Sequence, residues 1–208
     1  MPVSVRDAQT SFSGGLNTVS DPIALQANQV RRATNARLTE YGGITKRNGS
    51  VRLASAAIAS AVQNGFTWFK DDGTAQALAV ANGTLYTLNP LAAIGSQTWA
   101  SQSGALSTSE PPSLVEFLDG SGNEVVFIAD GGLLNYWNGT ALTTNITGTQ
   151  DCRYIKVHNE RLWGAGSTTN PDSIFYSALN NGVTLGIAAS SGGEIIVRTF
   201  SDERIVGL

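Results

Sequence analysis

The sequence predicts an all-β protein whose body consists of antiparallel meander sheets about the size of propeller blades. Three observations support this prediction. No stretch after residue 55 shows a sustained apolar period of 3.6 residues, short apolar runs recur, and turns containing Gly or Asn separate them. We therefore expect a propeller-like body, preceded by an N-terminal arm with a short helix and a hairpin.

The body repeats one local plan: a short apolar run, a turn, and a strand that bears a large aromatic residue. Asn-Gly and Asp-Gly turns accept the positive φ that tight hairpins need. The repeats and their turns are 77–88 with Asn82-Gly83, 125–137 with Asp130 to Gly132, and 154–166 with His158 to Glu160.

The number of blades is a difficulty for this prediction. We expect blades to open at 65–69, 113–118 and 151–157, and a fourth to begin at 193–200. A closed propeller usually has about four to eight blades. Because open sheet edges invite aggregation, either the chain is part of something longer or neighbouring subunits cover the edges.

The N-terminal arm is expected to span residues 1–55, and the propeller-like body residues 56–208. Ser20 or Asp21 before Pro22 is typical of a helix start. Alternation over 34–39 and 44–47, with a turn between them, predicts a hairpin.

Charge is distributed unevenly along the chain, whose formal net charge is −3. Residues 1–55 hold seven basic and three acidic residues, a net of +4, and the remainder holds six basic and thirteen acidic residues, a net of −7. A basic arm predicts a negative partner, either nucleic acid or the acidic body of a neighbouring copy. A solvated hairpin without a partner is the alternative. The candidate interface or DNA-channel residues are Arg31, Arg32, Arg37, Lys46, Arg47 and Arg52.

The chain offers little for catalysis or metal binding. Cys152 is the only cysteine, so no intrachain disulfide can form, and His158 is the only histidine, which argues against a His-rich metal site or a Ser–His–Asp triad. Residues 119–124 carry alternating oxygen ligands suited to calcium, but a hairpin turn explains the same residues. We expect no catalytic residues, no metal and no cofactor.

No basic-then-apolar leader and no apolar run of membrane-spanning length is visible, so we expect a soluble protein without an export signal. Four tryptophans could form a sugar-stacking surface, but their similar places in the repeats favour core packing. They are Trp68, Trp99, Trp137 and Trp163.

Two groups of motifs resemble a known family. The first, at the N-terminus, resembles the opening signature of tailed-phage tail and head–tail connector proteins, and the closest type is the podovirus tail nozzle (tail tubular protein B-like). It comprises 12–17 (FSGGLN), Asp21-Pro22, Leu25, Asn35 and 43–49 (GITKRNG). The second resembles a strand pair of a blade in those proteins and comprises 153–155, 159–163, Gly166, 170–172 and 174–177.

The resemblance implies a β-propeller built into a ring, a hexamer in that family, around the DNA exit channel. It implies a structural virion protein of the tail, made in the host bacterial cytoplasm, without enzymatic activity. Expected partners are further copies, neighbouring adaptor, portal or fibre proteins, and genomic DNA contacted without sequence preference. We expect the Gly-Gly turns of the arm to dock one subunit on the next; they are Gly14, Gly15, Gly42 and Gly43.

Two other functions stay open. A carbohydrate-binding host-recognition module at the tail tip or fibre would use exposed tryptophans in a groove. A glycan hydrolase would need two carboxylates facing each other across a cleft. Glu110, Glu116 and Glu124 are available for that role but show no partner pattern.

Overall fold

A computed structural model describes residues 13–19, 21–26, 28–30, 32, 34–39, 43–102, 104–187, 190–197 and 205–208. The chain divides into two compact units, Met1–Val51 and Arg52–Leu208.

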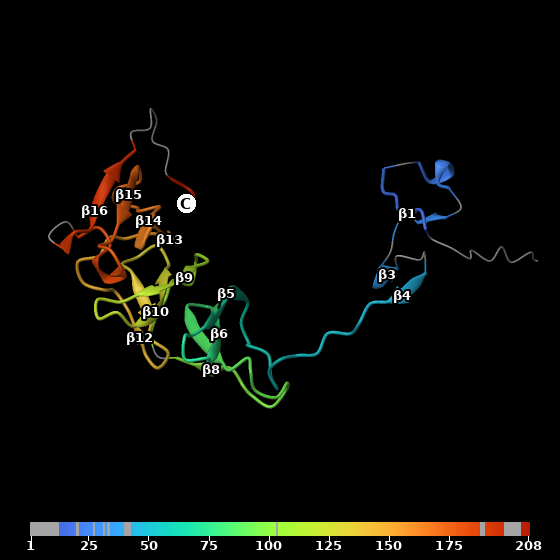
Figure 1. Cartoon of the computed structure of the whole chain (residues 1–208), viewed down its shortest axis with the longest axis horizontal. Coiled ribbons are helices and arrows are strands. Elements are labelled where there is room, and N and C mark those ends of the chain that lie inside the picture. Colours follow the sequence, from blue (N-terminus) through green and yellow to red (C-terminus); the bar gives the residue numbers. More distant parts are fainter. Residues whose placement is uncertain are drawn as a thin grey trace, which may run out of the picture. The chain divides into compact units, whose positions relative to one another are not determined.

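The second unit contains three four-stranded sheets, each an antiparallel meander. They appear in Figure 1 as successive green, yellow and orange groups. The first comprises β5 (Val62–Phe69), β6 (Ala75–Ala81), β7 (Thr84–Leu88) and β8 (Ala100–Ser101). The second comprises β9 (Ser113–Leu118), β10 (Glu124–Ala129), β11 (Asn135–Trp137) and β12 (Leu142–Thr143). The third comprises β13 (Tyr154–His158), β14 (Arg161–Ala165), β15 (Ser173–Tyr176) and β16 (Gly193–Ile196).

These sheets confirm the predicted all-β fold class. A short 3-10 helix, η2 (Gly182–Thr184), lies in the connection from β15 to β16. Two of the three predicted turns form tight hairpins, whereas the predicted turn at Asp130 to Gly132 is part of a longer connection from Ala129 to Asn135. Asn82 and Gly83 have φ of 46° and 72°, and Asn159 and Glu160 have φ of 47° and 57°. Two consecutive positive φ values match the twist of antiparallel strands, so each pair closes a two-residue hairpin.

The second sheet is packed on both faces. From β10, Val125 and Phe127 join a cluster with Leu162 and Phe175 of the third sheet. Val126 and Ile128 of the same strand join a second cluster, with Trp68 and Leu78 of the first sheet. Alternate residues of a strand point to opposite faces, so one continuous apolar run supplies both layers of the core.

The first strands of the three sheets lie next to one another. β9 contacts both β5 and β13. Asn64 Nδ2 of β5 donates to the carbonyl of Pro112 at 2.7 Å, just before β9. Ser113 Oγ accepts from the main-chain N–H of Ile155 in β13 at 3.4 Å. This arrangement is compatible with that of a propeller, in which four-stranded sheets surround a central channel.

One prediction about the blades was wrong. Gly193–Ile196 does not open a fourth sheet; it is β16, which pairs antiparallel with β15 as the edge strand of the third sheet. The long connection through η2 hid this pairing, because alternation alone does not say which neighbour a strand joins. The described residues therefore contain three complete four-stranded sheets.

The first unit is small and built from short pairings. β1 (Gly15–Leu16) pairs parallel with β2 (Gln29–Val30), and between them lies the 3-10 helix η1 (Pro22–Ala24). The Asp21 carboxylate caps η1 by accepting from the N–H of Ile23 at 2.9 Å, as the helix-start motif predicted. β3 (Ala36–Leu38) and β4 (Ile44–Lys46) form the predicted hairpin.

Phe127→Ala should destabilise the second unit strongly. The side chain is fully buried between the second and third sheets, so its removal leaves a cavity. We expect a loss of about 3–5 kcal/mol in the free energy of unfolding, measured by urea denaturation. Phe127→Leu, which fills more of the space, is the matched variant and should cost less; equal and small costs for both would contradict this packing.

Candidate functional site

The basic hairpin of the first unit carries its cations on both faces. Arg37 lies directly opposite Thr45, and Lys46 lies directly opposite Ala36. Since the side chains of neighbouring strand residues alternate between faces, Arg37 and Lys46 project to opposite sides of the hairpin. One flat partner surface cannot contact both of them.

A hollow of about 300 Å³ lies beside the end of β4. Lys46, Arg47 and Asn35 line it, together with 48–50. The N–H of Arg47 donates to the carbonyl of Asn35 at 2.9 Å, which continues the hairpin by one step beyond β4. Asn35 has a φ of 55°, a conformation that Asn tolerates better than most residues. The local chain path therefore places two cations at the rim of a concave surface.

The other predicted cations are spread more widely. Arg31 lies outside the described residues, and Arg52 belongs to the second unit. Arg32, Arg37 and Arg52 are exposed, as are Lys46 and Arg47. Within the described ranges, the ion pair between Arg153 and Glu110 is the one that forms, so none of these cations is matched there by a carboxylate.

Glycines of the arm act through close approach as well as through turns. A Cβ on Gly14 would lie 2.6 Å from Cγ of Gln29 and 2.7 Å from Oδ1 of Asn28, so a larger residue there would require these two side chains to shift. Gly15 belongs to β1 itself. Gly43 accepts from the N–H of Thr39 at 2.8 Å and closes the hairpin, whereas Gly42 lies outside the described residues.

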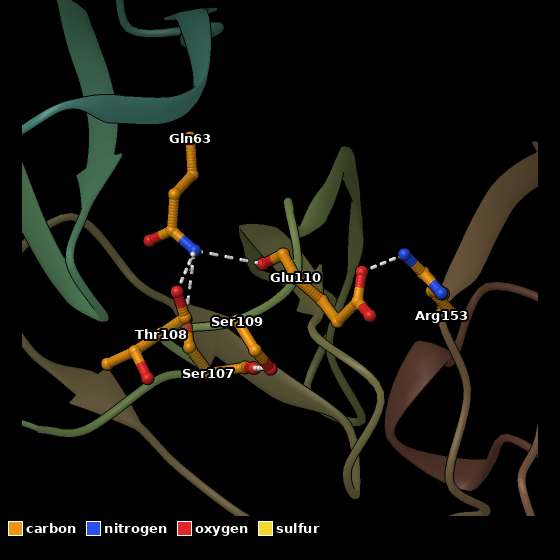
Figure 2. A network of polar contacts seen from close by, with 6 residues as sticks. All are labelled: Gln63, Ser107, Thr108, Ser109, Glu110 and Arg153. Atoms are coloured by element: carbon orange, nitrogen blue, oxygen red, sulfur yellow. Dashed lines mark hydrogen bonds and ion pairs between the residues drawn. The ribbon is translucent and has the colours of Figure 1, made fainter.

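A polar junction joins the connection between the first two sheets to the start of the third. Figure 2 shows Gln63 of β5 donating to the carbonyls of Thr108 at 3.3 Å and Glu110 at 3.0 Å. The Glu110 carboxylate then forms an ion pair with Arg153, which lies just before β13. The junction thus ties the three sheets together through one segment, 107–110.

The same junction borders a hollow of about 430 Å³. Asp130 lies in its wall and accepts from the N–H of Ser107 at 2.8 Å and of Gly132 at 3.2 Å. Its carboxylate is therefore occupied by main-chain groups of two connections. Among the described residues that line the hollow there is no aromatic side chain, so this part of the wall offers no surface on which a sugar ring could stack.

The possible calcium loop is a self-contained turn. Asp119 accepts from the N–H of Ser121 at 2.7 Å, from the N–H of Asn123 at 2.9 Å and from Nδ2 of Asn123 at 3.0 Å. These bonds outweigh the effect of burial and lower the pKa of Asp119. In the described part of the chain, no group of three or more His, Cys, Asp or Glu residues could hold a metal ion.

Asp151 organises the loop between β14 and β15. Burial acts to raise the pKa of Asp151, but hydrogen bonds outweigh it and lower the pKa below its usual value. Ser167 Oγ donates to it at 2.8 Å, and Thr168 donates through its N–H at 2.7 Å and its hydroxyl at 2.9 Å. The next residue, Cys152, is fully buried, and this burial raises the pKa of its thiol to about 12.

The four tryptophans divide into two pairs. Trp68 and Trp137 are buried in the core between the first two sheets, as predicted. Trp99 packs against a smaller cluster on the other face of the first sheet. Trp163 is half-buried, with its ring 5.5 Å from that of Tyr176 and its Nε1 donating to the carbonyl of His158 at 3.0 Å. Core packing therefore accounts fully for two of them.

The carboxylates considered for hydrolysis do not form an obvious catalytic pair. Glu110 is engaged by Arg153. Glu116 and Glu124 lie on the same face of the second sheet, and burial, followed by the charge of Glu124, raises the pKa of Glu116. The N–H of Asp71 donates to Glu124 at 3.2 Å, so this carboxylate also links the first two sheets.

Comparison with known proteins adds no assignment. No protein-family model matches the chain, and no curated protein is significantly similar to it. None of the helices in the described residues is both long and apolar enough to span a membrane.

Asp151→Asn should lower stability most at neutral pH. Because the folded state lowers this pKa, the stabilisation is present above the unfolded pKa, near 3.9, and disappears as pH falls through the folded value. The difference in urea midpoint between wild type and variant should therefore shrink in acid. Asp172→Asn is a matched substitution in the same region, and an Asp151→Asn deficit that stayed constant with pH would contradict this role.

Cys152 should be unreactive while the protein is folded. Its thiol has no solvent exposure and a pKa of about 12, so almost no thiolate is available near neutral pH. We expect a disulfide reagent to label it only after denaturation, at one thiol per chain. Fast labelling of the native protein would show that the second and third sheets separate readily.

Proposed function

We propose that the protein is a non-enzymatic structural subunit of a phage tail or head–tail junction, which self-assembles as a ring around a DNA channel. The ring, a hexamer by family resemblance, would be part of the virion and would contact neighbouring adaptor, portal or fibre proteins. The proposal rests on the resemblance of the N-terminal motifs and on the charge of the arm.

The observation that carries the proposal is the set of unmatched cations on the basic hairpin. Arg37, Lys46 and Arg47 are exposed and form no ion pair within the described residues. The body of the chain is acidic, with a net of −7 after residue 55. In a ring, the hairpin of one copy would meet the acidic body of the next, and its two charged faces would allow it to lie between two surfaces.

A channel-lining role is the competing form of the same proposal. Cations that face a lumen would contact DNA phosphates without reading sequence. The hollow beside Lys46 and Arg47 has a size and charge that also suit a phosphate group. The two forms differ in what charge reversal would disrupt.

Carbohydrate binding is the second candidate function, and one observation favours it. Trp163 borders a hollow of about 240 Å³ on the outer face of the third sheet, which is also lined by Lys156, His158, Ile174 and Leu208. A partly exposed tryptophan of this kind can stack on a sugar ring. A glycan array with wild type and Trp163→Ala would detect such binding.

Reversing the charge of Arg37 and Arg47 to Glu should impair ring formation without unfolding the body. Loss of one partner in a desolvated interfacial charge pair typically costs about 2–5 kcal/mol, and much less at a wet rim. Rings are counted by negative-stain microscopy, and thermal melting reports on the fold. Arg37→Lys with Arg47→Lys, which keeps both charges, is the matched control.

Two outcomes of this experiment would contradict the interface role. Normal rings with weakened DNA retention would assign the hairpin to the channel. Normal rings with unchanged DNA retention would show that the hairpin has neither role.

A further inference from the structure

An asparagine followed by glycine is the dipeptide at which a protein chain changes most readily without an enzyme. The main-chain nitrogen of the glycine loses its proton and attacks Cγ of the asparagine, ammonia leaves, and a five-membered succinimide forms. Water then opens the ring at either carbonyl, which gives aspartate or isoaspartate. Glycine lacks the Cβ that would hinder the attack. The chain has five such Asn-Gly steps, which begin at Asn48, Asn64, Asn82, Asn138 and Asn181.

Ring closure depends on how freely the chain moves at each step. An intramolecular reaction needs its two atoms within roughly 3–3.5 Å and correctly oriented. The asparagine must therefore rotate its main chain until the nitrogen of the next residue faces Cγ. Hydrogen bonds to the amide, pairing in a sheet and tight packing all oppose this rotation, and the structure distributes them unequally over the five steps.

Asn64 and Asn138 are restrained through their side-chain amides. Asn64 belongs to β5, its Nδ2 donates to the carbonyl of Pro112 at 2.7 Å, and its Oδ1 accepts from the N–H of the next residue at 2.8 Å. That nitrogen thus keeps its proton directed at oxygen instead of carbon. Asn138 Oδ1 accepts from the N–H of Thr140 at 2.9 Å and of Ala141 at 2.7 Å, which fixes the turn between β11 and β12.

Asn82 and Asn181 are restrained through the glycines that follow them. Gly83 is buried in its hairpin, and its N–H donates to Oε1 of Gln63 at 3.0 Å, so the nitrogen that would attack is engaged. Gly182 is also buried, and it begins η2 directly after Asn181. Four of the five steps are therefore held by the fold of the second unit.

The remaining step, Asn48-Gly49, carries none of these restraints. Strand pairing of the basic hairpin ends at Lys46, and the last main-chain bond there joins Arg47 to Asn35. Asn48 and Gly49 are exposed, lie outside regular secondary structure, and form no hydrogen bond with any residue that the structure describes. A Cβ on Gly49 would meet no atom within 4 Å, so nothing crowds the rotation.

A carboxylate at position 48 would change the charge of the basic hairpin. Asn48 lines the hollow of about 300 Å³ together with Lys46 and Arg47. With a fourth acidic residue against seven basic ones, the net charge of residues 1–55 falls from +4 to +3. Charges interact over about 8 Å at physiological ionic strength, so a carboxylate at the rim of this hollow would weaken the attraction of both cations for an anion.

We propose that Asn48 deamidates spontaneously through a succinimide with Gly49, so that the basic hairpin gains a carboxylate and loses affinity for anionic partners as the protein ages. The chemical step follows from the exposure of Asn48-Gly49 and is independent of the proposed function. Its effect on assembly rests on that function, because it requires the hairpin to meet a negative surface.

Peptide mapping of the full chain during incubation at mildly alkaline pH follows each step separately. Trypsin cleaves after Arg47 and Arg52, so residue 48 falls in a peptide of its own, 48–52. We expect the folded protein to deamidate there first. In urea the other four asparagines should react faster and Asn48 at nearly its native rate, because only the other four lose a restraint. A digest of fresh protein corrects for deamidation during digestion.

Gly49→Ala tests the proposed chemistry without disturbing the fold. The added methyl group lies in open space, but it hinders the approach of the nitrogen to Cγ of Asn48. Deamidation at this residue should slow by at least about tenfold, because small displacements of reacting atoms reduce intramolecular rates steeply. The rates at the other four steps should not change, and they serve as internal controls.

Asn48→Asp reproduces one product and tests the charge effect directly. Retention on heparin, a sulfated polymer, measures the affinity of the chain for anions. Asn48→Asp should elute at lower salt than wild type, whereas Asn48→Gln, which stays neutral, should elute with it. Asn159→Asp adds the same charge at an exposed position of the acidic body, and as the matched control it should elute close to wild type.

Three results would overturn the proposal. An Asn48 amide that persists in the folded protein while the unfolded chain reacts would show that the fold restrains this step. First loss at another Asn-Gly step would place the reaction elsewhere. Unchanged heparin retention of Asn48→Asp would contradict the loss of affinity. Deamidation at Asn48 with weaker retention, but normal rings after reversal of Arg37 and Arg47, would support this inference and contradict the proposed function alone.

Discussion

The packing of β10 against both neighbouring sheets is the interaction on which the rest of the second unit depends. Residues 125–129 are all completely buried, and they face the third and first sheets in turn. At roughly 25 cal/mol for each Å² of apolar surface buried, a strand buried on both faces contributes about twice as much as one with a solvated face. Both main core clusters contain residues of this strand, one shared with the third sheet and one with the first.

Double-sided packing constrains the connections around it. The segment 107–110 passes from the first sheet to the second, and its carbonyls accept from Gln63 while Glu110 pairs with Arg153. Gly83 shows how closely the chain segments pack in this region, because a Cβ there would lie 2.6 Å from the carbonyl oxygen of Leu106. Main-chain groups near a dry core need partners, and polar side chains from the neighbouring sheets supply them.

Much of the fold could be predicted from the sequence because its signals are local. The Asn-Gly turn at 82–83, the capping of η1 by Asp21 and the hairpin of β3 with β4 each depend on a few adjacent residues. Pairings between strands that are far apart in the sequence were harder to predict. β16 joins β15 across a connection that includes η2, and the parallel pairing of β1 with β2 joins strands on either side of η1.

The candidate site shows the same division between local and non-local information. Charge counting identified a basic arm, but not that Arg37 and Lys46 project from opposite faces of the hairpin, because the predicted strands had no register. Tryptophan spacing predicted the burial of Trp68 and Trp137, yet could not say that Trp163 would lie on an end face with no sheet beyond it among the described residues. Which face of a strand is covered depends on the neighbours of its sheet.

The second unit repeats one kind of four-stranded sheet three times in a stack. Its two end faces are the outer faces of the first and third of these sheets. A sheet in the middle needs two apolar faces of matching shape, as the second sheet has. The end sheets carry the same strand pattern, so each also presents an apolar face: alanines below Phe69 on the first, and Trp163 with Ile174 on the third. A solvated end would be expected to carry charged side chains across its surface instead. Large side chains lie on both end faces: Phe69, Tyr86 and Leu88 pair with the alanines of the first sheet, and Trp163, Tyr176 and Ile195 lie on the third.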